Sequence, residues 1–198
     1  LSALPDKVSI VVASAFADGL ARASTVRSND ETGMRLLIEH LIENGHQKIA
    51  HISTEGGAVS ASRREAYKSV MSAKGLGKYI QIQMTNTATE TAGLDAAEIL
   101  TSSKNAPTAI TCFNDLIAIG AQGATDRSVA VVGYDNTFLA ELRQISLTSI
   151  DPANFEIAER AAQLLVESSE SEVKKGKTYL LEPRLVIRES SKSLAKVN

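Results

Sequence analysis

The amino-acid sequence predicts an α/β protein built on doubly wound parallel sheets, and three observations support this prediction. Short apolar runs rich in β-branched residues alternate with longer stretches in which apolar residues recur every three or four positions. One strand and one helix recur at intervals of roughly 30 residues, the length of a βα unit. The run at residues 129–133 is almost continuously apolar, as in a strand that a parallel sheet buries on both faces.

The first predicted unit begins with a buried strand at residues 8–13. A polar loop is expected to follow through Ser28. A helix then runs over residues 30–44, and either Asn29 or Asp30 can cap its N-terminus. The spacing of three and four residues predicts one apolar face, which contains Met34, Leu37, Ile38, Leu41 and Ile42.

The second unit follows the same plan. Gly45 stands where a helix C-cap glycine is expected, and residues 48–52 form the next strand. The following helix is predicted over residues 61–74, with Ser60 or Ser62 as its N-cap.

Three further strands and two helices complete the alternation. Residues 80–84 alternate in polarity and predict a strand, and residues 90–103 predict a helix. Residues 108–112 form the next strand. Asn114, with the aspartate that follows it, caps a short helix through Ala121, and the apolar run described above is the strand that comes next.

The last quarter of the chain breaks the regular order. A short strand at residues 147–150 precedes a helix from Asp151 to about residue 167, with Pro152 in its first turn. A polar surface loop is expected at residues 169–177. We expect two late strands, at residues 179–181 and 185–188, joined around Glu182 and Pro183. A frayed tail is predicted at residues 190–198.

Composition narrows the class of protein. The 198 residues suffice for one large domain or two small ones, and a net charge of -2 lacks the basic excess of a stand-alone nucleic-acid binder. No apolar stretch approaches the roughly 20 residues that cross a membrane, and the first residues have no secretory signal core. With a single cysteine, Cys112, a cytoplasmic location is expected.

A parallel α/β sheet binds ligands beyond the carboxyl ends of its strands. The loops that follow Ile52, Cys112 and Gly133 are therefore the predicted location of a site. Because aromatic residues make up only 4% of the chain, an extensive stacking surface for sugars or single-stranded nucleic acid is not expected.

These loops lie in segments that resemble the lactose/galactose-repressor (LacI/GalR) family of transcriptional regulators. Five ordered segments are similar to family motifs. They are EHLIENGHQKIAHI at residues 39–52, PTAI with NDLIAIG at 107–120, VVGYDN at 131–136, LTSI at 147–150 and EPRLVIRESS at 182–191.

The resemblance implies a periplasmic-binding-protein-like type I sensor fold whose two lobes bind a metabolite between them. It also implies a homodimer and an operator-binding helix-turn-helix domain, which this chain lacks together with the first two βα units. Residues 46–144 and 178–190 would form the C-terminal lobe. Residues 1–45 and parts of 145–190 would form the incomplete N-terminal lobe and the crossovers. The short helix near residues 114–121 and the segment after 178 are candidate dimer surfaces.

Three polar residues carry the predicted ligand site. Asp135 follows a strand, and its carboxylate can accept hydrogen bonds from hydroxyls, although an aspartate here also suits a plain turn. Arg63 matches a family arginine that can hold a carboxylate, phosphate or diol; the alternatives are Arg64 or a solvated helix arginine. Asn114 resembles the family's cleft asparagine, but a pure N-cap is the simpler interpretation.

Two weaker candidates complete the ligand-binding set. Phe113 would supply an apolar wall or point into the core, and Ser14 follows the first predicted strand. No cofactor and no metal are predicted, because the three histidines fall on different elements and no cysteine or carboxylate cluster joins them. These histidines are His40, His46 and His51.

The sequence therefore predicts the sensing and dimerisation core of a repressor, with a sugar or sugar phosphate as effector on family frequency. Purine or nucleoside effectors also occur in the family. The alternative is a sugar-binding transport protein of the same fold, for which a secretory signal would be needed. An enzyme is not expected, because the chain has no nucleophile elbow, P-loop or dinucleotide-binding glycine motif, and Cys112 lies in a buried strand.

Overall fold

The computed structural model describes residues 8–17, 19–125, 129–169 and 176–191. It confirms the α/β class with sheets that are mainly parallel. The chain separates into two compact units, with boundaries between Asn29 and Asp30, between Asp151 and Pro152, and between Pro183 and Arg184. Of the described residues, the larger unit contains those of the ranges 30–151 and 184–191, and each unit is described by itself below.

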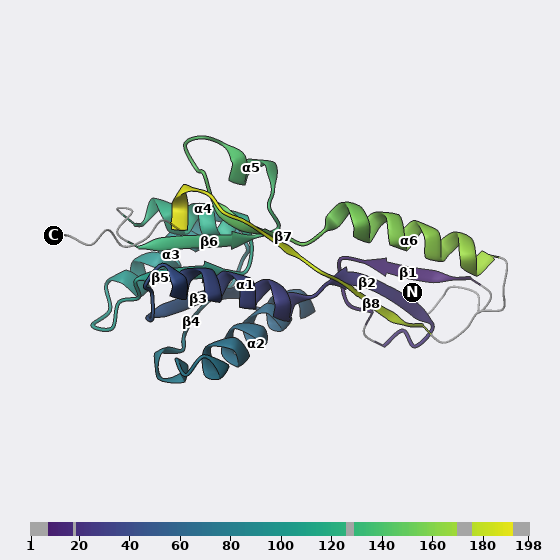
Figure 1. Cartoon of the computed structure of the whole chain (residues 1–198), viewed down its shortest axis with the longest axis horizontal. Helices are drawn as coiled ribbons and strands as arrows, with labels where there is room; N and C mark the ends of the chain where they lie inside the picture. The colour runs from purple at the N-terminus through teal and green to yellow at the C-terminus, as the bar shows by residue number, and fades with distance from the viewer. Residues whose placement is uncertain (1–7, 18, 126–128, 170–175, 192–198) are drawn as a thin grey trace. The chain divides into compact units, whose positions relative to one another are not determined.

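The larger unit is built on a six-stranded sheet in which only the last pair of strands is antiparallel. The strand order is β4-β3-β5-β6-β7-β9 (Figure 1). The strands are β3 (Ile49–Thr54), β4 (Gln81–Thr85), β5 (Ala109–Cys112), β6 (Ala130–Tyr134), β7 (Thr148–Asp151) and β9 (Arg184–Val186).

Helices cover both faces of this sheet, so its central strands are buried on both sides. On one face α1 (Asp30–Glu43) and α2 (Ala58–Ala73) pack together, and the apolar stripe of α1 is buried as its spacing predicts. On the other face lie α3 (Glu90–Thr101) and α4 (Asp115–Gly123). Three single turns complete the unit: η1 (Gly77–Tyr79), α5 (Phe138–Glu141) and η2 (Glu189–Ser191).

The order of strands creates a reversal point between β3 and β5. From β3 the chain passes to β4 on one side, and it then returns to place β5 on the other side. In open parallel sheets, ligands bind beyond the carboxyl ends of the strands at such a point. The loops after β3 and β5, where the sequence predicts a site, therefore lie at this reversal point.

The smaller unit has a three-stranded parallel sheet in the order β1-β2-β8, flanked by one helix (Figure 1). The elements are β1 (Ile10–Ala13), β2 (Ala23–Ser28), β8 (Thr178–Leu181) and α6 (Asn154–Ser169). Its core consists of Val26, Ile157, Ala161 and Leu164.

Several predicted elements need correction. The polar loop expected before Ser28 contains β2, whose mixed composition becomes a strand because β1 and β8 pair with it on both sides. The turn α5 was not predicted. The helix α2 begins three residues early, at Ala58, and Ser60 does not cap it, because its hydroxyl bonds to Ser53 and Thr54 instead.

The end of the chain is more ordered than expected. The predicted frayed tail begins with η2, in which Ser191 is buried and the Ser190 hydroxyl donates to the Val131 carbonyl at 2.6 Å. The rest of that tail, and most of the loop expected at 169–177, lie outside the described residues.

The unit boundaries also differ from those expected for the two lobes. The helix α1, expected in the N-terminal lobe, belongs to the larger unit because it packs on α2 and the sheet. The strand β8, expected in the C-terminal lobe, belongs to the smaller unit because it pairs with β2. Within the described ranges, no helix combines the length and the hydropathy that a membrane span requires.

Candidate ligand-binding site

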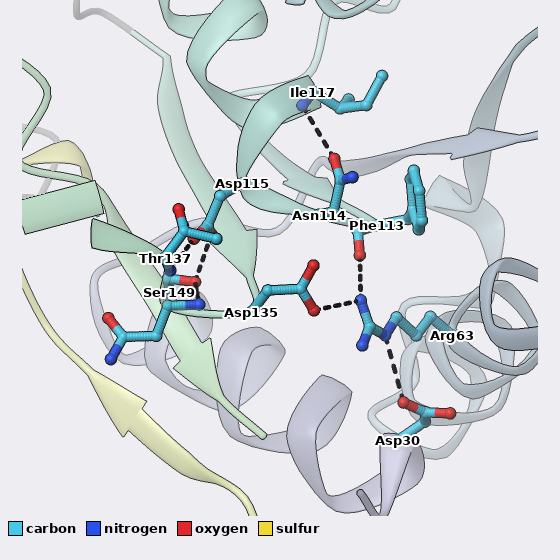
Figure 2. Close-up of polar contacts among 10 residues, drawn as sticks. Asp30, Arg63, Phe113, Asn114, Asp115, Ile117, Asp135, Thr137 and Ser149 are labelled. Carbon is cyan, nitrogen blue, oxygen red and sulfur yellow. Dashed lines mark hydrogen bonds and ion pairs between the residues drawn. The ribbon is translucent and has the colours of Figure 1, made fainter. Parts of the chain in front are cut away.

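A buried arginine lies at the reversal point of the larger sheet. Arg63, in α2, has 6% of its surface exposed, and two carboxylates flank its guanidinium. Its Nε donates to Asp30 Oδ1 at 3.2 Å, and its Nη1 lies 3.0 Å from Asp135 Oδ1 (Figure 2). A buried charge must be paired, and this arrangement pairs it twice.

An aromatic ring and a backbone carbonyl also contact the Arg63 guanidinium. Its Cζ lies 3.6 Å from the centre of the Tyr134 ring, in a cation–π stack. Nη1 also donates to the Phe113 carbonyl at 2.6 Å. Tyr134 itself packs tightly on α1, where a Cβ at Gly33 would overlap the Tyr134 hydroxyl. Neighbours from four elements and loops thus fix the position of Arg63.

Asp135 follows β6 and occupies an unusual backbone conformation. Its φ angle is 103° and that of Asn136 is 45°, values that side-chain-bearing residues rarely adopt. Its amide donates to the Ile150 carbonyl at 2.9 Å, which holds the start of the turn on β7. Strained conformations of this kind are concentrated at functional sites.

The ionisation of the pair follows from burial and charge. Burial raises the pKa of the Asp135 carboxyl by more than the charge of Arg63 lowers it, and the nearby Asp115 also raises it. Burial lowers the pKa of the Arg63 guanidinium, but the charges of Asp135 and Asp30 and the nearby Tyr134 outweigh this effect and raise it. Arg63 therefore stays charged, whereas Asp135 takes up a proton more readily than an exposed aspartate.

The predicted residues of the β5 loop lie beside this group. The Asn114 Oδ1 atom accepts from the Ile117 amide at 2.9 Å, so its N-cap role is confirmed. Phe113 is half-buried and packs against the core on the α3 and α4 side. Figure 2 shows its carbonyl directed at Arg63. Arg63, Phe113, Asn114 and Asp135 are thus brought together, and ligand contact by each of them stays a prediction.

Ser14 belongs to the smaller unit, where it is exposed just after β1. Its φ angle is 55°, and its amide donates to the Val26 carbonyl at 2.9 Å. Its predicted role as a ligand contact also stays a prediction.

Each of the three histidines has its own structural partner. His40 bonds to Ser191, His46 to Thr108 and His51 to Thr111, at 2.8, 3.1 and 3.0 Å. Among the described residues, no group of three or more histidine, cysteine or acidic side chains lies close enough to hold a metal ion. Cys112 is buried, and burial raises its thiol pKa.

The sequence pattern does not reveal the part that three residues of this region have in the site. It indicates a possible helix cap for Asp30, a place at the start of a helix for Asp115 and no role for Tyr134. Asp115 is 1% exposed, and burial raises the pKa of its carboxyl although hydrogen bonds from Ser149 and Thr137 lower it. Asp30 and Asp115 are both acidic residues in the first turn of a helix, which usually serve the helix dipole, and Asp115 also lies in the NDLIAIG motif.

Comparison with known proteins places this geometry in a family. The model of the periplasmic binding protein-like domain matches residues 38–191. A LacI transcriptional regulator from a Rhodococcus species superposes with a TM-score of 0.88 at 32% identity, over 98% of this chain and 73% of that one. The chain belongs to the LacI family of transcriptional regulators. The resemblance inferred from the five sequence segments is thereby confirmed.

Other LacI-family relatives extend the comparison. The HTH-type transcriptional repressor PurR of Mannheimia succiniciproducens is 30% identical over 178 residues, which are 86% of this chain and 53% of that protein. A LacI-family regulator from Enterococcus faecium, solved with bound ribose, has a TM-score of 0.78 at 24% identity and covers 91% of this chain and 68% of its own. The chain thus spans about half the length of the curated relatives it matches.

Proposed function

We propose that this chain is the ligand-sensing and dimerisation core of a DNA-binding transcriptional repressor, and that its effector is a small neutral sugar. In the proposal, the effector lies against Arg63 and Asp135 and alters operator binding. Operator DNA is bound by a helix-turn-helix domain elsewhere in a longer protein, and the repressor acts in the cytoplasm. The relatives described above are named as transcriptional repressors or regulators, which supports this function over an enzyme.

The observation that supports the proposal best is the paired guanidinium of Arg63 at the sheet reversal point. Charged acceptors and donors held rigidly at one place suit a ligand with several hydroxyls, since each hydroxyl can both donate and accept. The side-chain oxygen of Asn114 accepts the helix-cap hydrogen bond from the Ile117 amide. The side-chain nitrogen of Asn114 is a further hydrogen-bond donor nearby.

The charge of the site favours a neutral sugar over a sugar phosphate. Two carboxylates, Asp30 and Asp135, surround one guanidinium, so the group carries a net charge of about -1 when all three ionise. A phosphate would meet this negative charge in a partly buried place, where repulsion is screened little. An uncharged polyol meets no such penalty.

A thermal-shift screen of the chain tests the proposal. The panel contains neutral pentoses and hexoses, with D-ribose among them, their phosphates, and purine bases and nucleosides. A neutral sugar present at 100 times its Kd should stabilise the folded chain by about 2.7 kcal/mol. Preference for the phosphorylated sugar or for a purine would contradict the effector class, and the absence of any shift would contradict the sensing role.

The dimer surface that we propose lies on α4 and α5, which contact each other. The helix α4 was already a candidate from the sequence. Large apolar side chains are exposed there: Phe138 by 76%, Leu142 by 44% and Leu116 by 39%. A second copy of the chain is the proposed occupant, because a two-fold repressor matches palindromic half-sites.

A further inference from the structure

The turn that presents Asp135 is fixed by one buried carboxylate. Asp115, the first residue of α4, directs both of its oxygens at this turn and at β7 (Figure 2). Its Oδ2 accepts from the Thr137 amide at 2.6 Å and from the Thr137 hydroxyl at 2.9 Å. Its Oδ1 accepts from the Ser149 hydroxyl at 2.5 Å.

The Ser149 hydroxyl links Asp115 to Asn136, the middle residue of the turn. While it donates to Asp115, its oxygen accepts from the Asn136 amide at 3.1 Å. The carboxylate thus holds Thr137 directly and Asn136 through one hydroxyl. Both positions follow the strained Asp135, whose φ angle of 103° would otherwise relax.

The space around Asp115 is adapted to this role. It lies against Gly133 of β6, where an added Cβ would overlap Asp115 Oδ1. On the other side of the turn, Arg188 Nη2 donates to the Asn136 side chain at 2.9 Å, and Nη1 donates to the Leu147 carbonyl at 2.7 Å. An acidic residue that merely served the helix dipole would not need the hydrogen bonds that Asp115 accepts from Thr137 and Ser149.

We propose that Asp115 is a positioning residue of the ligand site: it does not touch the effector, but holds the 135–137 turn so that the Asp135 carboxylate stays at Arg63. The proposal rests on the function proposed above, in which Asp135 binds the effector. The residues that transmit the effect of Asp115 are Thr137 and Ser149.

The substitution Asp115→Asn tests this proposal with almost no change of volume. An amide has a single acceptor oxygen, so when that oxygen accepts from the two Thr137 donors, the Ser149 hydroxyl loses the acceptor for its proton. In two-dimensional ¹⁵N–¹H spectra of the chain without ligand, we expect the Asn136 and Thr137 amide signals to move. By calorimetry, the affinity for the best neutral sugar of the panel, or for D-ribose, should fall about tenfold or more.

Two further variants separate positioning from general destabilisation. Thr137→Val removes the hydroxyl bond and should weaken sugar binding partly, and Thr137→Ser should recover it. The matched control is Ile110→Val, a buried change in β5 that lowers stability without touching the turn. It should leave both the affinity and the turn signals in place.

Either of two results would overturn the proposal. One is unchanged Asn136 and Thr137 signals in Asp115→Asn. The other is a loss of affinity no larger than that of Ile110→Val. A wild-type chain that binds no sugar would refute the proposed function instead, and the spectra, recorded without ligand, would still decide whether Asp115 fixes the turn.

Discussion

At the scale of single residues, the site depends on how the charge of Arg63 is balanced. A lone buried guanidinium would be strongly destabilising, and removing one partner of a buried pair typically costs 3–5 kcal/mol. Here Asp30 and Asp135 share that role, and Tyr134 stacks on the group. Asp30 is nearly buried, whereas 35% of the Asp135 side chain is exposed. Asp135 is therefore the partner that a ligand can reach.

The binding of a neutral sugar should depend on pH through Asp135. A protonated carboxyl accepts hydrogen bonds from hydroxyls less well, and burial raises the pKa of this group. Affinity should therefore decline on acidification, beginning at a higher pH than for an exposed aspartate. Asp135→Asn should bind about tenfold or more weakly, with a flat pH profile in calorimetric titrations.

An exposed aspartate provides the control for this prediction. Asp95→Asn makes the same chemical change on the solvent side of α3 and should preserve both the affinity and its pH dependence. A pH profile that persists in Asp135→Asn would show that another group is responsible.

Stability should depend on pH through His51. This side chain is fully buried in β3, and burial lowers its pKa from 6.5 to about 3. Between these two values the unfolded chain binds a proton that the folded chain does not, so stability falls as the pH falls from 6.5. The loss should be roughly 1 kcal/mol per pH unit, and urea unfolding between pH 7.5 and about 4.5 measures it.

His51→Leu should flatten this pH dependence of stability, because the leucine side chain cannot bind a proton. Ile49→Val, in the same strand, should lower stability by a similar amount at every pH and leave the slope unchanged. If the slope of the His51 variant equals that of wild type, the acid sensitivity arises elsewhere, for example at His46, whose pKa burial also lowers.

At the scale of elements, the contact between α3 and α4 depends on two glycines. A Cβ at Gly93 would overlap the backbone carbonyl of Ile117, and one at Gly120 would overlap that of Glu90. Neither backbone can move aside as a flexible side chain can. The glycines therefore let the two helices approach closely and hold α4, with Asn114 at its start, beside the site.

Alanine at Gly93 or Gly120 should destabilise the chain. Glycine to alanine in a helix favours folding by up to about 1 kcal/mol, but overpacking costs about 1–3 kcal/mol and should prevail. The matched control is Gly123→Ala, in the same helix as Gly120, since its Cβ would lie at an ordinary contact distance of 3.6 Å from the Leu94 side chain. Chemical denaturation should show a loss for the first two variants, and a loss of equal size for the third would contradict the argument.

At the scale of the whole molecule, the α5 part of the proposed dimer surface begins at the residue that follows the 135–137 turn. Thr137 is both the residue held by Asp115 and the residue before α5, whose Phe138 is 76% exposed. The short α5 helix thus connects the proposed effector contact to the proposed dimer surface through adjacent residues. This continuity offers a direct physical route for coupling between the two.

Phe138→Asp should convert the dimer to a monomer, because it places a charge in an apolar interface. Light scattering after size exclusion should show the monomer mass, with the dimer Kd raised about tenfold or more. Phe155→Asp, an equally exposed phenylalanine on α6 of the smaller unit, is the control and should remain dimeric. Dimers of Phe138→Asp would contradict the proposed surface.

The sequence by itself determined the strand-helix alternation, the apolar face of α1, the cap at Asn114 and the three loops, after β3, β5 and β6, in or next to which Arg63, Asn114 and Asp135 lie. These features are local: periodicity and cap chemistry act over a few residues, so they can be recognised without knowing what lies nearby. Three of the five motifs that carried the family resemblance, at residues 39–52, 107–120 and 131–136, overlap these segments.

Only the tertiary structure decided which distant residues meet. The strand β2 forms because β1 and β8 pair on both of its edges, and β8 and β9 separate into different sheets although they are adjacent in sequence. Asp30 pairs with Arg63 across 33 positions, and Asp115 reaches Thr137 across 22. Such pairings depend on which segments the folded sheet brings together, and local sequence patterns do not encode that.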